Sequence, residues 1–171
     1  MTTSYILDTG PLSTLCSFPL NGSPYIYTVL KYASVLLADG VITEAGRGKI
    51  WRTVSPLINT GEIKSISSPI EPEILDTSYG NDLGLGERST IKLGLKLGLI
   101  TVIDDRDAFV VANRFGIHPI GFQDWVVKLV QESDLSVQTA IEIVKASAKQ
   151  YPKMYLAHTL QLLSSSELRT K

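Results

Sequence analysis

The sequence is poor in the residues that build disulfide and zinc frameworks. It has one cysteine, Cys16, and two histidines in 171 residues. An intrachain disulfide is therefore excluded, and so is a zinc site built from paired Cys and His ligands. A lone thiol is typical of a protein in a reducing compartment, so a cytoplasmic location is expected.

The chain also lacks a strong net charge and a long apolar run. It carries 16 Lys and Arg against 17 Asp and Glu, a net charge of -1. A nucleic-acid substrate would therefore have to be held by a local basic patch. No apolar stretch reaches the roughly 18 residues that a membrane helix needs, and residues 1–5 do not open a signal peptide. No membrane partner is expected.

What the chain does have is an alternation of short strands and helices. Hydrophobic residues make up 44% of it and charged residues 19%, which is enough apolar material for one core. Strands are expected at 5–7, 33–38, 62–66, 99–103 and 119–121, with helices between them and a loop over 67–82. Pro11 is expected at the first position of the first helix. Short connections of this kind favour an α/β fold with a small parallel sheet flanked by helices.

The chain after residue 122 has a helical pattern throughout. Apolar residues recur at helical spacing over 125–130, over 137–148 after the N-cap Ser136, and over 156–163 after Pro152. We therefore divide the chain into a domain over residues 1–122 and a helical C-terminal extension over residues 123–171. The extension is expected to pack on the domain or to contact another subunit or partner.

Two acids are expected at the ends of buried strands. Asp8 follows the apolar run 5–7, and Asp104 follows the run 99–103. The carboxyl ends of parallel strands form the binding crevice of an open α/β sheet, so the two carboxylates meet if their strands are neighbours.

Two further acids lie in the first turns of expected helices. Glu87 shares a helix face with Ile91 and Leu95, so it points toward the protein. Glu44 follows Val41 by about one turn. The helix dipole favours such acids without any function, and the aspartates could be ordinary helix caps. The prediction of a functional site therefore rests on the four acids taken together and not on any one of them.

A cluster of carboxylates is informative because the charges repel and burial adds a desolvation cost. It persists when protons or a cation neutralise it. Oxygen ligands without His or Cys suit Mg²⁺ or Mn²⁺. An ion held in this way can generate a hydroxide nucleophile and stabilise the charge that develops on a phosphate. The cluster therefore favours metal-dependent hydrolysis of a phosphodiester.

Four motifs stand in order along the chain, Ile6 to Leu12, Val41 to Glu44, Leu83 to Arg88 with Ile91, and Val102 to Ala108, and they are followed by Asn113 to Ile117 and Pro119 to Gly121. These motifs resemble the PIN-domain family, and within it the VapC-like ribonuclease toxins that have a Gly-Glu motif and a later pair of aspartates. The resemblance spans residues 4–122. The first connection, with its loop over 18–27, is longer than the family pattern, and the helical tail departs from it.

The resemblance implies a metal-dependent endoribonuclease that is the toxin of a toxin–antitoxin pair. By position the catalytic acids would be Asp8, Glu44, Glu87, Asp104 and Asp105, with Asp8, Glu87, Asp104 and Asp105 holding Mg²⁺ or Mn²⁺. Asp105 is a near-equal candidate for the place of Asp104, and Asp107 is a weaker one. The expected partners are an RNA substrate, a protein antitoxin and a second copy in a homodimer. The alternative is a catalytically inactive PIN-like module that binds another protein.

RNA would also need cations close to the acids. Candidates are Arg47, Lys49 and Arg52 after Glu44, Arg88, Lys92 and Lys96 on the helix of Glu87, and Arg106 and Arg114 beside the aspartates. Ordinary solvated faces explain these residues equally well. Trp51 could stack on a base, although a core position is favoured.

Two other classes of enzyme share part of the first motif. Asp8-Thr9-Gly10 spells the aspartic-protease triplet, but those enzymes need a β-rich body and two aspartates that share a proton. A phosphatase with an aspartyl nucleophile would have a second Asp where Gly10 stands. Neither fits the sequence as well as the nuclease.

Overall fold

A five-stranded parallel sheet forms the centre of the protein. The structure is a computed structural model that describes residues 2–20, 22–68 and 83–165. The strands are β1 (Ser4–Leu7), β4 (Ser34–Ala38), β5 (Ile63–Ile66), β6 (Ile100–Val102) and β7 (Pro119–Ile120), in the order β5-β4-β1-β6-β7. The predicted parallel α/β fold is confirmed, and it differs from the β-rich body of an aspartic protease.

Strand β1 lies at the middle of this sheet, between β4 and β6. Tyr5 pairs with Val35 on one side and with Ile100 on the other. The main-chain amide of Asp8 donates to the carbonyl oxygen of Val102 at 3.0 Å. The chain therefore leaves β1 and β6 at neighbouring positions on the same edge of the sheet. The acids that follow these two strands, Asp8 and Asp104, can then lie close together.

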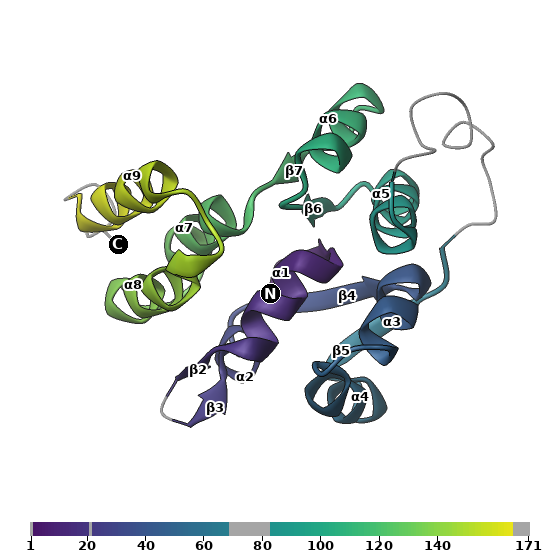
Figure 1. The fold of residues 1–171 in the computed structure, drawn as a ribbon, viewed down its shortest axis with the longest axis horizontal. Coiled ribbons are helices and arrows are strands. Elements are labelled where there is room, and N and C mark those ends of the chain that lie inside the picture. The colour runs from purple at the N-terminus through teal and green to yellow at the C-terminus, as the bar shows by residue number, and fades with distance from the viewer. Residues whose placement is uncertain (1, 21, 69–82, 166–171) are drawn as a thin grey trace.

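Helices fill the connections between the strands (Figure 1). They are α1 (Thr9–Ser17), α3 (Asp39–Gly46), α4 (Trp51–Asn59), α5 (Leu85–Leu97) and α6 (Arg106–Arg114). Helix α1 begins at Thr9, so Pro11 is its third residue and not its first. The position remains favourable because first-turn amides have no partner within the helix. Helix α5 ends at Gly98, whose φ of +63° is left-handed, as expected of a C-terminal glycine.

The long first connection folds on itself without disturbing the sheet. It contains the antiparallel strands β2 (Pro19–Leu20) and β3 (Ser23–Pro24), followed by the short helix α2 (Tyr25–Val29). Tyr25, Ile26 and Val29 are buried, so the extra residues add to the core. The loop expected over 67–82 lies outside the described residues from position 69 onward.

The C-terminal helices are α7 (Phe122–Glu132), α8 (Val137–Ala146) and α9 (Lys153–Ser164), with the short 3₁₀ helix η2 (Ser147–Lys149) between the last two. Figure 1 shows them grouped on one side of the sheet, with α3 and α5 on the other. No helix among the described residues has the length and apolar character that crossing a membrane requires.

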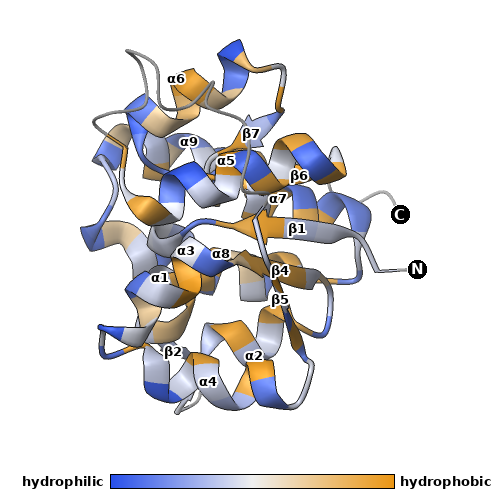
Figure 2. Ribbon diagram, turned by 90° about the vertical axis from the view of Figure 1, so that its right-hand side faces the viewer, coloured by the Kyte–Doolittle hydropathy of each residue, from blue (hydrophilic) through white to orange (hydrophobic). Residues whose placement is uncertain are grey.

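The C-terminal helices share the main core with the sheet. Trp125 of α7 is fully buried and meets the Tyr5 ring of β1 edge to face, with centroids 5.5 Å apart. Figure 2 shows hydrophobic residues on β1 and β4, whereas hydrophobic and hydrophilic residues alternate along the helices. The extension therefore covers one face of the central strands.

Gly40 marks the closest approach of α3 and α5. A Cβ on this glycine would overlap the Leu85 carbonyl and the Ser89 hydroxyl. We expect Gly40→Ala to lower the free energy of unfolding by roughly 1–3 kcal/mol, because the two helices would have to separate. Urea denaturation measures the change. Gly46→Ala in the same helix, where a Cβ meets nothing within 4 Å, should be neutral or stabilising, and equal losses at both positions would contradict the argument.

Candidate active site

Asp8 stands where β1 ends and α1 begins. It is 4% exposed, and its side chain makes no cap hydrogen bond to α1. Asp8 is thus the N-cap residue of α1 by position, but no capping bond of its side chain accounts for its burial. Its Oδ1 is buried and has no hydrogen-bond partner among the described residues. A buried carboxylate oxygen without a donor is costly, and a proton or a cation would relieve that cost.

Asp104 reaches the same place from β6, two residues after Val102. Its Oδ1 accepts a hydrogen bond from the amide of Phe122 at 2.8 Å, and its Oδ2 accepts one from the Tyr151 hydroxyl at 2.5 Å. A Cβ on Gly10 would lie 3.9 Å from the Asp104 Cβ. Although the residue as a whole is exposed, its carboxylate faces protein groups over the first turn of α1.

Asp105 caps a helix, which its neighbour Asp104 does not. Its Oδ1 accepts hydrogen bonds from the amides of Asp107 and Ala108, each at 2.9 Å, so it is the N-cap of α6. Burial raises the pKa of Glu87, and the charges of Asp105 and Asp107 are among those that raise it further. The structure therefore brings Asp104 toward Asp8, and it brings Asp105 and Asp107 toward Glu87.

Glu44 and Glu87 come from the paired helices α3 and α5. Glu44 accepts the Thr9 hydroxyl at Oε2 (2.5 Å) and the Gly86 amide at Oε1 (2.8 Å). Glu87 accepts the Gly84 amide at 2.8 Å and so closes the first turn of its own helix. A Cβ on Gly86 would overlap the Glu44 carboxylate, so this glycine is what lets α5 approach it.

The charges of the other three acids act on Asp8. Burial first, and then the charges of Glu87, Glu44 and Asp104, raise the pKa of Asp8, which a hydrogen bond from the Thr9 amide lowers, and the net result is a pKa of about 7. Burial also raises the pKa of Asp104. Acids that are far apart in the sequence thus converge at the carboxyl edge of the sheet.

Two residues of this site were missed in the sequence. Tyr151, between η2 and α9, donates to Asp104 and stacks on Phe122, with ring centroids 5.8 Å apart. Asp124, in the first turn of α7, carries a negative charge that raises the pKa of Asp104 further, although the effect of burial is larger. Both lie in the segment assigned to the helical extension, where neither had an apolar strand before it to signal a site.

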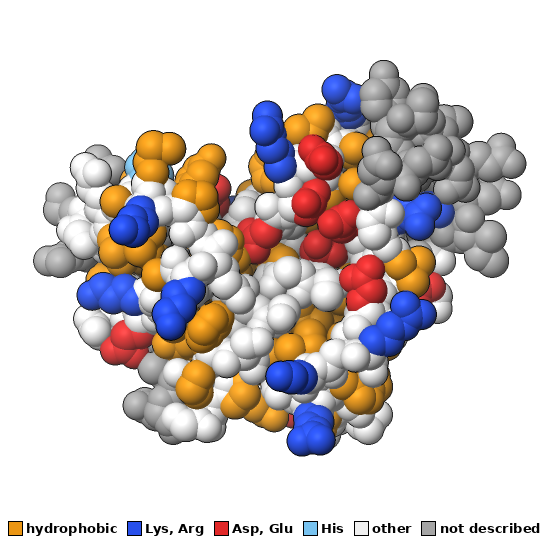
Figure 3. Space-filling view, in the orientation of Figure 1, with side chains coloured by type: hydrophobic (Ala, Val, Ile, Leu, Met, Phe, Trp, Pro, Cys, Tyr) orange, Lys and Arg blue, Asp and Glu red, His pale blue; other side chains and the backbone are white. Residues whose placement is uncertain are grey.

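The chemistry of the donor set fits a hard divalent cation. All the acids offer oxygen, and Asp8 Oδ1 is buried without a donor. Among the described residues, no group of three or more His, Cys, Asp or Glu side chains is arranged closely enough to hold a metal ion. Glu44, Glu87 and Asp104 each accept hydrogen bonds from protein donors instead. Figure 3 shows acidic side chains gathered in a hollow of this face, with Lys and Arg around it.

Comparison with known proteins gives the family. A family model for the PIN domain matches residues 4–165 of this chain. The chain belongs to the PIN-domain family. Its fold is similar to that of a PilT N-terminus domain protein from the hyperthermophilic archaeon Sulfolobus solfataricus P2, with a TM-score of 0.51 and 12% identity over 74% of this chain and 93% of the other. A comparison with curated proteins gives no match.

This PIN domain presents most of the predicted basic residues to solvent. Arg47, Lys49 and Arg52 are exposed, and so are Arg106 and Arg114. Trp51 packs against the main core, which agrees with the core position favoured for it. Arg47, Lys49, Arg52 and Arg106 therefore present positive charge to solvent.

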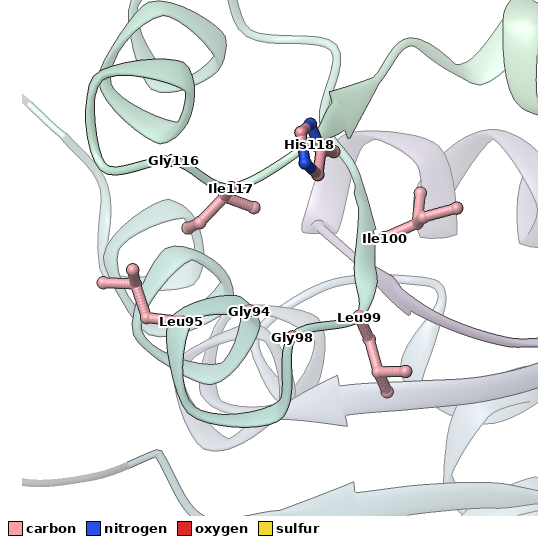
Figure 4. Close-up of a pocket in the computed structure, with 8 residues that line it drawn as sticks. All are labelled: Gly94, Leu95, Gly98, Leu99, Ile100, Gly116, Ile117 and His118. Carbon is pink, nitrogen blue, oxygen red and sulfur yellow. The ribbon is translucent and has the colours of Figure 1, made fainter.

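A separate pocket of about 130 Å³ lies at the opposite edge of the PIN-domain sheet. It is lined by the end of α5, the start of β6 and the turn before β7, including Leu95, Ile100, Ile117 and His118 (Figure 4). Because it meets β6 at its amino end, it lies apart from the acids that follow the carboxyl end of that strand.

The raised pKa of Asp8 predicts how stability depends on pH in a chelator. Folding raises this pKa from 3.8 to about 7. Above pH 3.8 the unfolded chain releases a proton that the folded chain retains. The free energy of unfolding should therefore fall as pH rises from about 4 to about 7, by of the order of 4 kcal/mol, and then level off.

Urea denaturation in EDTA across this pH range measures the effect. Asp8→Asn removes the carboxyl group and should flatten this part of the profile. Asp134→Asn, at an exposed position, should follow the unsubstituted protein. A profile that keeps its full slope in Asp8→Asn would refute this account of the cluster.

Proposed function

We propose that the chain is a divalent-metal-dependent endoribonuclease and the toxin of a toxin–antitoxin pair. The observation that carries the proposal is the unpartnered, buried Oδ1 of Asp8 among three other acids. Membership of the PIN-domain family supports a nuclease fold. Beyond that fold, we propose the endoribonuclease activity, the metal dependence and the toxin role.

The residues that would hold Mg²⁺ or Mn²⁺ are Asp8 and Asp104 directly, with Glu87 and Asp105 as further ligands. When bound, such an ion lowers the pKa of a water molecule and offsets the charge that develops on a phosphate. The acids supply oxygen only, which is what these ions prefer.

The chain fixes these acids with its own donors. The Phe122 amide and the Tyr151 hydroxyl hold Asp104, and the Gly86 amide and the Thr9 hydroxyl hold Glu44. Side chains locked in this way need little reorganisation when charge develops near them. The supporting hydrogen bonds are therefore part of the proposed site.

The reaction proposed is hydrolysis by in-line attack of water. A new bond forms between the water oxygen and phosphorus, and the bond from phosphorus to the 3′ oxygen breaks. Glu44 and Glu87 are the acids assigned to orient the water and take its proton, and the 3′ oxygen takes a proton from solvent as it leaves. The products are a 5′-phosphate and a 3′-hydroxyl.

The direct test is cleavage of an end-labelled single-stranded RNA by the purified chain. We expect cuts in Mn²⁺ or Mg²⁺, none in EDTA, and a 5′-phosphate on the downstream product. Intact RNA in both ions would overturn the proposal, and so would equal cleavage in EDTA or by Asp8→Asn.

The toxin role is tested by induced expression in a bacterium. Growth arrest by the unsubstituted chain and not by Asp8→Asn supports a toxin with a protein antitoxin as partner. Harmless expression of both favours the alternative, an inactive PIN-like module. The protein donors already bonded to Glu44, Glu87 and Asp104 are the observation in favour of that alternative. Light scattering of the purified chain tests the proposed homodimer.

A further inference from the structure

The segment that joins α8 to α9 forms a cationic elbow beside the acids. We define the elbow as residues 149–155, from the last residue of η2 through the first turn of α9. Lys149, Lys153, Met154 and Tyr155 are exposed, the last two at 75% and 60%. None of the described residues after Glu142 is acidic, and three are lysines. The elbow therefore has a local positive charge that the whole chain, at -1, does not.

Two hydrogen bonds fix the elbow against the acid cluster. The Tyr151 hydroxyl donates to Asp104, and the Thr14 hydroxyl of α1 donates to Gln150 Oε1 at 2.5 Å. The Thr159 hydroxyl of α9 also donates to Gln123 in the first turn of α7 at 2.9 Å. The middle of α9 is thus held beside the amino end of α7, and Tyr151, just before α9, stacks on the ring of Phe122, whose amide donates to Asp104. Figure 3 shows Lys and Arg side chains on the same face as the acidic hollow.

The first turn of α9 has donors to offer. Pro152 is its N-cap residue and no side chain caps the helix. The Tyr155 amide donates to the Pro152 carbonyl oxygen at 3.0 Å, which leaves the amides of Lys153 and Met154 as the donors that a ligand could reach. Uncapped amides at the amino end of a helix suit a phosphate. Lys153 is the first residue of that turn, and Lys149 precedes it by four residues. Tyr155, in the same turn, exposes an aromatic ring.

We propose that the elbow binds a single-stranded nucleic acid on one side of the cutting site. Lys149, Lys153 and the first amides of α9 contact its phosphates, and Tyr155 stacks on a base. Positive charge interleaved with an exposed aromatic ring is the combination that single strands need, because their bases are free to stack. A continuous duplex keeps its bases stacked within itself and gives Tyr155 nothing to bind. This inference rests on the proposed function, because it takes the acids to be the cutting site. Binding of nucleic acid to the elbow can be measured without cleavage.

The experiment measures binding of a fluorescein-labelled single-stranded RNA by anisotropy. The full chain carries Asp8→Asn so that the probe stays intact. The elbow variant is Lys149→Ala with Lys153→Ala. The matched control is Lys31→Ala with Lys64→Ala, which removes the same charge from exposed positions at the amino ends of β4 and β5. We expect the elbow variant to lose about 20-fold in affinity at 0.1 M salt and to lower the salt slope by about 1.4, since each phosphate contact on a single strand contributes about 0.7.

Tyr155 tests the stacking step. Tyr155→Ala should weaken binding about tenfold, and Tyr155→Phe should retain it. Equal losses in the elbow and control variants would overturn the inference, because net charge alone would then explain binding. Equal affinity for duplex RNA would overturn the single-strand step. A change in self-association with unchanged RNA affinity would assign the elbow to a contact between copies instead.

The two proposals fail separately. If the unsubstituted chain does not cut RNA but the elbow variant still loses RNA affinity, the endoribonuclease proposal fails and the elbow inference stands. If the unsubstituted chain cuts RNA and the elbow variant cuts and binds equally well, the elbow inference fails and the endoribonuclease proposal stands.

Discussion

Asp8→Asn should lower the rate of RNA cleavage by about a thousandfold or more while the protein remains folded. Asp8 is the acid whose carboxylate has a buried oxygen with no protein donor. A metal ion at such a site contributes several kcal/mol to the transition state, and each 1.36 kcal/mol is about tenfold in rate. Single-turnover cleavage of an end-labelled RNA measures the loss.

The stability of Asp8→Asn keeps this result interpretable. The raised pKa of Asp8 means that its charge opposes folding at neutral pH without a metal. The substitution removes that charge, so in EDTA the variant should be at least as stable as the unsubstituted chain. Lost activity could then not be attributed to unfolding. Added Mg²⁺ or Mn²⁺ should raise the melting temperature of the unsubstituted chain and not that of the variant.

The adjacent aspartates provide the internal comparison for this prediction. Asp104→Asn should lose activity as Asp8→Asn does, because its carboxylate lies over the start of α1 with Asp8. Asp105→Asn should lose much less, since Asn also caps a helix well and Asp105 is the N-cap of α6. A larger loss for Asp105→Asn than for Asp104→Asn would overturn the placement of the ligands.

The convergence of Asp8 and Asp104 followed from local patterns and one rule of topology. Each acid ends a short apolar run, and short apolar runs between helices favour a parallel sheet. The remaining condition was that β1 and β6 be neighbours, and the sheet order satisfies it. Glu87 was predicted from the spacing of Ile91 and Leu95 on its helix face, and of these two Ile91 is buried whereas Leu95 is 39% exposed. These signals are local in the chain, so the sequence was enough for them.

The parts of the site that the sequence did not reveal depend on contacts between distant segments. Tyr151 bonds Asp104 across 47 positions, and Gln150 bonds Thr14 across 136. No local pattern encodes either contact. The choice between Asp104 and Asp105 was also open, because both follow the same strand. Hydrogen bonds to the Asp107 and Ala108 amides give Asp105 its cap role, and those depend on where α6 begins.

Trp125 tests whether residues 123–171 form an extension separate from the domain over residues 1–122. This side chain is fully buried, lies 5.5 Å from the Tyr5 ring and 6.3 Å from the Phe122 ring, and so connects α7 to the central strand. Trp125→Ala should cost about 3–5 kcal/mol of the free energy of unfolding, because a core tryptophan leaves a large cavity. That is a large share of the roughly 5–15 kcal/mol that holds a typical domain folded.

Circular dichroism during urea denaturation measures this loss without relying on tryptophan fluorescence. Trp125→Phe keeps an aromatic ring and removes an indole N–H that has no partner among the described residues, so it should cost much less. Trp51→Ala, at a half-buried position, should also cost less. If the C-terminal helices share one cooperative core with the sheet, Trp125→Ala moves a single transition to lower urea. Two transitions, with the sheet unfolding at its original midpoint, would instead make residues 123–171 an independent extension, and Tyr151 could then leave Asp104 without unfolding the rest.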